Sequence, residues 1–214
     1  MNFSCSVVCA LPKYNTRFPR LFRTYPNPTN SSTSEDCAIW QAARATVASP
    51  SLFKSVKIQY LGGIVEEFVD AGYKCNNPSV VILEEATEVF GDDRAVGLFL
   101  SIGAGHPGVI KLPKADMFQK ELLKFLINIS EDCEQIVDEL KKRFSDIPHI
   151  YTRFNVSHGL ALDKLEEGQI VTHVKTYLAD IVESQKLNQV VESLISGVLP
   201  RSSVTLGSMS KLNI

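Results

Sequence analysis

Residues 66–103, EEFVDAGYKCNNPSVVILEEATEVFGDDRAVGLFLSIG, predict a strand, a helix and a second strand in succession. The first strand ends in the turn-forming sequence DAG at 70–72. Pro78 suits the first position of the helix, and Gly91 is typical of its end. The continuous apolar run at 95–103 is typical of a strand that is covered on both faces.

Further strands and a helix are predicted before this stretch. Short apolar or alternating runs at 5–11 and 20–25 predict two strands separated by a Pro-containing turn. A helix is expected from Asp36, as its cap, to Ser49, which precedes a proline. The segment VKIQY at 56–60 predicts another strand. Because strands and helices alternate, the first half is predicted to be α/β, with a mostly parallel sheet.

The second half is predicted to be mostly helical, because three sets of apolar residues recur at helical spacing. The sets are Ile136, Val137, Leu140 and Phe144; Ile170, Val174, Tyr177, Leu178 and Ile181; and Leu187, Val190, Val191, Leu194, Ile195 and Val198. We interpret these stripes as core faces, and contact with lipid or a partner is the alternative. Residues 201–214 are expected to form a disordered tail.

The composition favours one ordinary globular domain, with 44% apolar and 21% charged residues among 214. Lys and Arg total 22 against 24 Asp and Glu, spread along the chain, so nucleic acid is not an expected partner. No apolar run approaches the roughly 18 residues of a transmembrane segment, so any membrane contact is expected to be peripheral. The widely spaced cysteines contain no C-x-x-C pair and favour a reducing, cytoplasmic setting.

Neither a cofactor nor a metal ion is predicted. A match to G-x-G-x-x-G at Gly103–Gly108 would suggest dinucleotide binding if a helix opened there. Pro107 lies inside this segment, so we interpret it as the glycine-rich end of a strand. The histidines show no metal-ligand spacing; they are His106, His149, His158 and His173.

Asp70 is the acidic residue whose position suggests chemistry. It follows a predicted buried strand, and ligands and catalytic groups gather at the carboxyl ends of strands in open α/β sheets. An aspartate before Ala-Gly is also a common turn former that hydrogen-bonds its own backbone. The spacing alone leaves both interpretations open.

Four segments, in order, resemble the patatin-like phospholipases, particularly the fungal-type patatin domains. They are CAIWQAARATVASPSLF (37–53), FVDAGYKCNNP (68–78) with the helix SVVILEEATEVF after it, LFLSIGAG (98–105) and YTRFNV (151–156). The similarity extends from about Cys5 to Ile195. It implies a three-layer α/β/α fold, with residues 1–200 as the C-terminal portion of a patatin-like domain and a helical C-terminal part.

The resemblance also implies a lipid acyl hydrolase with a Ser-Asp dyad. Asp70 falls on the family's catalytic aspartate, in a motif completed by Ala71 and Gly72, and would be the base for a serine nucleophile. Ala71 replaces a glycine of the motif, and its Cβ would cost about 1–2 kcal/mol if the position required a positive φ. A lipid or membrane surface is the implied source of substrate.

The family's oxyanion loop and G-x-S-x-G elbow precede the matched part. No two glycines of this chain are four positions apart, and Gly62-Gly63 is interpreted as a turn. The chain is therefore expected to be inactive alone, with an exposed sheet edge that another chain could cover. The alternative is a non-catalytic module that binds lipid or protein on the same scaffold.

Overall fold

The computed structural model describes residues 5–27, 37–105, 109–113, 119–147, 149–156, 167–196 and 204–211. The chain divides into two compact units, where the composition suggested one domain. Unit one comprises Met1–Pro78 together with Ser130–Asp132, and unit two comprises Ser79–Ile129 and Cys133–Ile214. Both units combine helices with strands, so the α/β class is confirmed.

Unit one is built on a four-stranded antiparallel sheet of order β2-β1-β4-β3. The predicted strands are confirmed as β1 (Val7–Pro12), β2 (Arg20–Arg23), β3 (Val56–Gln59) and β4 (Val65–Asp70). β1 is central, because Val7 lies opposite Arg23 of β2 while Ala10 lies opposite Asp70 of β4.

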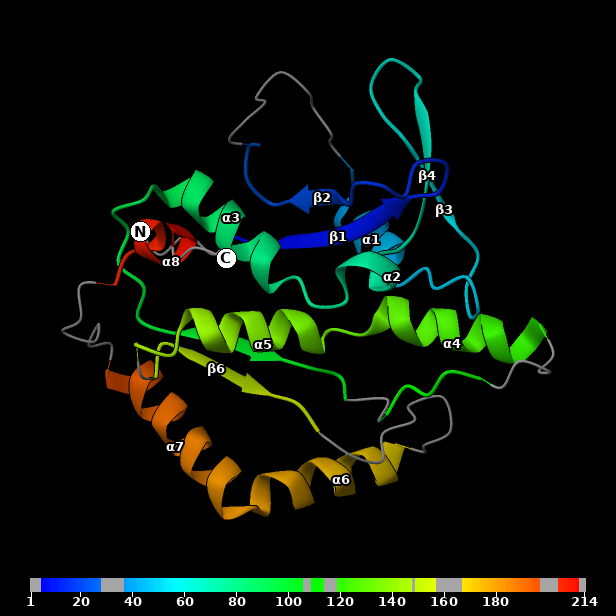
Figure 1. Cartoon of the computed structure of the whole chain (residues 1–214). Coiled ribbons are helices and arrows are strands. Elements are labelled where there is room, and N and C mark those ends of the chain that lie inside the picture. Colours follow the sequence, from blue (N-terminus) through cyan, green and yellow to red (C-terminus); the bar gives the residue numbers. More distant parts are fainter. Residues whose placement is uncertain are drawn as a thin grey trace. The chain divides into compact units, whose positions relative to one another are not determined.

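This antiparallel sheet corrects the prediction of a mostly parallel one. β1 and β2, and likewise β3 and β4, follow each other without an intervening helix. In the β3–β4 hairpin, cyan in Figure 1, the Tyr60 N–H donates to the Ile64 carbonyl at 2.9 Å. Gly62 and Gly63 form the turn, as expected, with φ of +90° and +82°. A short turn joins only antiparallel neighbours, since a parallel pair needs a long crossover.

Helix α1 (Ile39–Thr46) packs against the sheet of unit one. Ala45 of the helix is fully buried, as are Ala10, Ile58 and Phe68 of the strands. The rings of Phe68 and Phe22 meet edge to face, with centroids 5.2 Å apart. The small alanine side chains let the helix backbone approach the sheet closely.

The start of α1 differs from the prediction. Asp36, the predicted cap, lies outside the described residues, and Ala38 occupies the cap position. The Ala38 N–H donates to the Gln41 side-chain oxygen at 2.8 Å, so a glutamine in the first turn satisfies this backbone donor.

Unit two contains most of the helices and one pair of parallel strands. Strand β5 (Phe99–Ile102) pairs with β6 (Tyr151–Phe154), and Phe99 lies opposite Tyr151. The predicted 95–103 strand is therefore shorter than expected. Ile102 is 75% exposed, so the strand is not covered on both faces.

The helices of unit two include the predicted helix, which is confirmed as α3 (Ser79–Phe90) and begins one residue after Pro78, its predicted first position. Gly91, with φ +80°, follows its last residue as predicted. The others are α4 (Gln119–Glu131), whose end clusters with unit one, α5 (Glu134–Arg143), α6 (Glu167–Ala179), α7 (Ile181–Ser196) and α8 (Leu206–Lys211). No helix in the described ranges is long and apolar enough to cross a membrane.

The C-terminal residues correct the prediction of a disordered tail at 201–214. Val204, Leu206 and Met209 are buried, and α8 packs beside α3 (Figure 1). The backbone joins the unit as well, because the Val96 N–H donates to the Val204 carbonyl at 3.0 Å. The segment is mostly polar in sequence, but the apolar residues within its described part are buried. Residues 201–203 and 212–214 lie outside the described residues.

The three apolar stripes have different outcomes. The α5 stripe is a core face as predicted, since Val137, Leu140 and Phe144 are all at most 5% exposed. The prediction is wrong for half of the described members of the other two stripes, which are exposed. In α6 and α7, Val190 is buried, but exposed members include Val174, Ile181, Val191, Leu194 and Ile195. Val198 lies outside the described residues.

Candidate functional site

Asp70 is the last residue of β4, where the strand turns into the short helix α2 (Gly72–Cys75). Its N–H donates to the Ala48 carbonyl at 3.0 Å, and its Oδ1 accepts the Gly72 N–H at 3.0 Å. This side-chain contact is the local bond of a turn-forming aspartate. The turn-forming role is thus confirmed. Asp70 was a candidate because ligands gather at the carboxyl ends of parallel strands. The sheet is antiparallel, so the position of Asp70 in it does not indicate a catalytic role.

Ala71 fits its position without strain. Its φ is −81° and its ψ is −5°, so the cost attached to a positive φ does not arise. At Gly72 a side chain would be tightly placed, because a Cβ there would lie 3.2 Å from the Asp70 Oδ2. The glycine therefore leaves room for the carboxylate beside the backbone of α2.

A second carboxyl group, that of Glu131, acts on the same region of unit one. Its pKa is raised, first by burial and second by the negative charge of Asp70. The Asn76 side chain, just beyond α2, donates to the Glu131 carbonyl. A carboxyl group with a raised pKa therefore lies within the electrostatic reach of Asp70.

A cavity of about 1220 Å³ lies next to the Asp70 turn in unit one. Three segments line it: the turn that follows β1, residues 50–55, and the start of α2. Val69 and Tyr73, on either side of Asp70 in the sequence, are among the lining residues. The lining combines the basic side chains of Lys13, Arg17, Lys54 and Lys74 with the apolar or aromatic ones of Tyr14, Leu52, Phe53 and Tyr73.

Glu67 of β4 holds one wall of this cavity in place. Its carboxylate accepts hydrogen bonds from the Lys13 Nζ at 2.8 Å, the Tyr14 hydroxyl at 2.9 Å and the Ser55 hydroxyl. The Lys13 bond is the largest of the effects that lower the pKa of Glu67 to about 2. One acidic side chain thereby joins the turn after β1 to the segment before β3.

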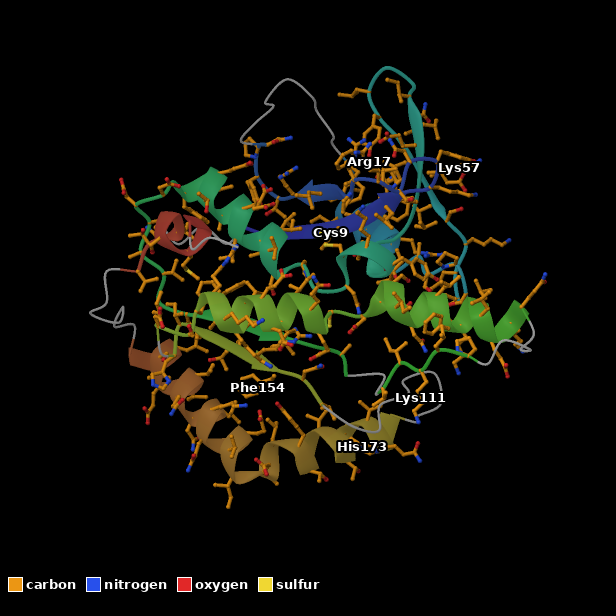
Figure 2. All side chains as sticks on the ribbon, viewed as in Figure 1. Cys9, Arg17, Lys57, Lys111, Phe154 and His173 are labelled. Carbon is orange, nitrogen blue, oxygen red and sulfur yellow. The ribbon has the colours of Figure 1, made fainter. Side chains whose placement is uncertain are left out.

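The remaining cations of the cavity have no acidic partner among the residues that the structure describes. Arg17, labelled in Figure 2, lies with its guanidinium 5.3 Å from the centroid of the Phe18 ring. Lys54 and Lys74 form no ion pair in the described ranges. Because uncompensated cations line an opening that also has apolar walls, the cavity suits a ligand with an anionic group and an apolar part.

Sequence reasoning missed this cavity, because its cations are distant in the sequence and only the fold gathers them. The run KYNTRF at 13–18 is the one local signal, since basic and aromatic residues alternate there with polar ones. In the structure Tyr14 and Phe18 are 82% and 66% exposed, as an accessible binding surface requires.

In unit two the structure brings together two of the segments that carry the family resemblance. Asn155 of YTRFNV accepts the Gly105 N–H through its Oδ1 at 2.9 Å. A Cβ on Gly103 would lie 2.3 Å from the same oxygen, so LFLSIGAG needs glycine for close packing. The glycine-terminated strand is confirmed, while residues 106–108 of the G-x-G-x-x-G match lie outside the described residues.

Arg153 anchors the contact between the same two segments. Its Nη1 donates to the Ser101 hydroxyl at 2.6 Å, and its Nη2 donates to the Cys133 sulfur at 3.5 Å. Close by, the Tyr177 hydroxyl donates to Glu183, and burial is the main cause that raises the pKa of Tyr177 to about 12. These contacts place partly buried polar side chains beside β6.

His149 and His173 lie within the described residues, and His106 and His158 lie outside them. His149 has φ +70°, a turn conformation. Within the described ranges, no three metal-ligating side chains come together.

No protein-family model matches the sequence, and no curated protein matches it at a significant level. The resemblance to patatin-like phospholipases therefore rests on the four quoted segments and remains a prediction.

Proposed function

We propose that this chain carries the catalytic aspartate, Asp70, of a patatin-like lipid acyl hydrolase that acts in lipid degradation. The three-layer α/β/α fold of that family is part of the proposal. The observation that carries it is the placement of Asp70, at the end of β4 with Oδ1 held by the Gly72 N–H, next to a cationic and partly apolar cavity. The cavity has the chemistry of a lipid ester with an anionic head group.

In this proposal the Asp70 carboxylate accepts the proton of a serine hydroxyl as that oxygen attacks an acyl ester. The bond from the Gly72 N–H to Oδ1 orients the carboxylate. The bond from the acyl carbon to the alcohol oxygen breaks, and the alcohol leaves with the proton that Asp70 took up. Water would then release the fatty acid from the acyl-serine intermediate and restore the serine hydroxyl. Within the described ranges, the bond that Asp70 accepts comes from a backbone N–H and not from a serine, and the sequence holds no G-x-S-x-G.

The test is release of fatty acid from a phospholipid, and of the alcohol from a short-chain ester, by the purified chain. We expect no turnover above a blank, because the nucleophile motif is missing. Asp70→Asn should then change nothing, as should Asp93→Asn, an exposed control aspartate. Turnover that Asp70→Asn abolishes and Asp93→Asn preserves would show that a serine of this chain reaches Asp70.

The transcript sequence upstream of Met1 provides a second test. An in-frame G-x-S-x-G there would supply the nucleophile, and the longer product should hydrolyse the ester. Asp70→Asn in that product should lower kcat by at least about a thousandfold, as for removal of other catalytic bases. A longer product that retains full activity with Asp70→Asn would contradict the proposal.

The second candidate is a non-catalytic module that binds a membrane surface peripherally. Two observations favour it. Arg17, Lys54 and Lys74 of the cavity in unit one have no acidic partner among the described residues, and unit two exposes apolar residues of α6 and α7, including Val174, Leu194 and Ile195. Within unit one, the exposed side chains of Tyr14, Leu52 and Phe53 line the same cavity as the cations, a combination typical of proteins that bind anionic membranes.

Co-sedimentation with vesicles tests this candidate. Saturable binding to vesicles of phosphatidylserine and phosphatidylcholine, without hydrolysis, would support it. Lys54→Glu with Lys74→Glu should weaken that binding, whereas Lys57→Glu on the exposed side of β3 (Figure 2) is the matched control. Absence of binding, or equal loss with the control variant, would contradict a role of the cavity in binding lipid.

A further inference from the structure

Two cysteines that lie 66 residues apart in the sequence come together in unit one. The sulfurs of Cys9 and Cys75 are 3.7 Å apart and joined by a hydrogen bond. Cys9 lies in the middle of β1, as Figure 2 shows, and Cys75 is the last residue of α2. The sequence gives no sign of this pair, since the two cysteines belong to no short cysteine motif.

We propose that Cys9 and Cys75 are a redox-sensitive thiol pair, which a hydroperoxide converts into an intramolecular disulfide. The proposal rests on the distance between the sulfurs and on their unequal exposure. It does not depend on the proposed hydrolase function.

The two thiols have different surroundings, which assign them different roles. Cys75 is partly exposed, so a small oxidant in solvent reaches it first, whereas Cys9 is only 8% exposed. The hydrogen bond between the two thiols is the first cause that lowers the pKa of the Cys75 thiol, and burial opposes this effect. Since the thiolate is the reactive form, Cys75 is the attacking cysteine and Cys9 the resolving one.

The chemistry balances with hydrogen peroxide as the oxidant. The Cys75 thiolate attacks one peroxide oxygen, the O–O bond breaks, and the departing hydroxide takes up a proton to become water. Cys75 is then a sulfenic acid. The Cys9 sulfur attacks the Cys75 sulfur, the S–O bond breaks, and the hydroxyl group leaves as a second water with the Cys9 proton. Two thiols are oxidised to one disulfide, and one peroxide is reduced to two waters.

The geometry requires only a small movement. A disulfide bond is about 2.05 Å long, so the sulfurs must approach by roughly 1.7 Å. Helix α2 is a single short turn, and a displacement of this size requires no rearrangement of the sheet.

The disulfide would join the two elements that flank Asp70. Ala10, the residue after Cys9, lies opposite Asp70 in the sheet, and Gly72, which binds the Asp70 carboxylate, begins α2. Oxidation would therefore tie the turn that holds Asp70 to the central strand. The turn that holds Asp70 would then be less mobile in the oxidised chain than in the reduced one.

The experiment uses the full chain, reduced and then treated with hydrogen peroxide at low protein concentration. After the remaining thiols are alkylated, peptide mapping by mass spectrometry should find the Cys9 and Cys75 peptides linked. The number of alkylated thiols should fall by two from the five of the reduced chain. Dithiothreitol should restore all of them.

Variants distinguish the roles of the two thiols. In Cys9→Ser, dimedone should trap a sulfenic acid at Cys75, because the resolving thiol is gone. In Cys75→Ser, Cys9 should remain a thiol. Cys5→Ser is the control, since Cys5 is exposed and its removal should leave the Cys9–Cys75 link unchanged. Circular dichroism checks that each variant folds, and the map of the unmodified chain decides by itself if one does not.

Three outcomes would overturn the proposal. Cys9 and Cys75 could both remain thiols while Cys5 is oxidised. Cys9 could instead form its disulfide with Cys37. The disulfides could also form only between chains, in proportion to protein concentration.

Discussion

Helices α5 and α7 carry the same kind of apolar stripe but have opposite surroundings. In α5, Val137 and Leu140 are 2% and 1% exposed. In α7, Leu194 and Ile195 are 64% and 80% exposed, although Val190 of the same helix is buried. Both stripes recur at helical spacing in the sequence.

The difference shows what helical periodicity does and does not determine. It identifies the apolar face of a helix, because residues three or four apart lie on one side. It does not identify what covers that face. Leu140 is covered because Leu83, Ile150 and Met209, from distant parts of the sequence, pack in the same cluster.

Leu140→Ala should cause the largest loss of stability. A small loss would contradict the contrast between a buried α5 stripe and an exposed α7 stripe. The change removes buried carbon atoms and leaves a cavity, which costs about 2–5 kcal/mol in the free energy of unfolding. Urea denaturation followed by circular dichroism measures it. A loss below 0.5 kcal/mol, roughly the scale of a surface change, would show that α5 is not part of a core.

Met209→Ala should destabilise the chain by about 2–3 kcal/mol, near the lower end of the range for buried methionine. Met209 is fully buried in the same cluster as Leu140, although its segment looks like a tail. The same urea experiment measures the change. A variant as stable as the parent chain would support the disordered tail and refute the observed packing of α8.

Val190→Ala sharpens the comparison within α7 itself. Val190 is 5% exposed, and two methyl groups contribute about 1–2 kcal/mol when buried. The expected loss is therefore smaller than for Leu140 but measurable by urea denaturation. A loss of stability no larger than that of Leu194→Ser, a substitution on the exposed side of the same helix, would mean that α7 is exposed on all sides.

The contact between Glu67 and Lys13 in unit one should stabilise the fold less than any of these three buried residues. It should do so only above acidic pH. The pKa of Glu67 is about 2 in the folded chain against an ordinary 4.5, so its contribution is complete above pH 4.5. It is lost as the pH falls towards 2, because the unfolded chain then binds the proton more readily. Glu67→Gln should flatten the decrease in stability between these pH values.

Acid titrations of the parent chain and Glu67→Gln, followed by circular dichroism, measure this difference. Glu66→Gln is the control, since Glu66 lies next to Glu67 on β4 and forms its own ion pair, with Arg20 of β2 at 2.9 Å. Equal acid sensitivity of Glu67→Gln and the parent chain would show that the Lys13–Glu67 contact does not stabilise the fold.

Leu194→Ser should have the smallest effect on stability, within about 0.5 kcal/mol, because the side chain is mostly in solvent. It should weaken binding to vesicles if the α7 stripe contacts lipid. Stability is measured by urea denaturation and binding by co-sedimentation. A loss above 1 kcal/mol, about twice that surface scale, would show that the side chain of Leu194 is covered and not in solvent.

The sequence by itself determined the local elements of the Asp70 region. Pro78 and Gly91 mark the bounds of α3 because proline and glycine restrict or release the backbone at their own positions. The turn at Asp70 was predictable because an aspartate side chain in a turn commonly accepts a hydrogen bond from a backbone N–H two residues on. Four strands of unit one were also recognisable from short runs of apolar or alternating residues.

Tertiary structure alone decided the direction of those strands, the burial of α8 and the exposure of α7. It also gathered the cations of the cavity and brought the sulfur of Cys9 to that of Cys75. The physical reason is range. Backbone preferences and turn bonds act within a few residues, whereas burial and charge depend on which distant segments the fold places side by side.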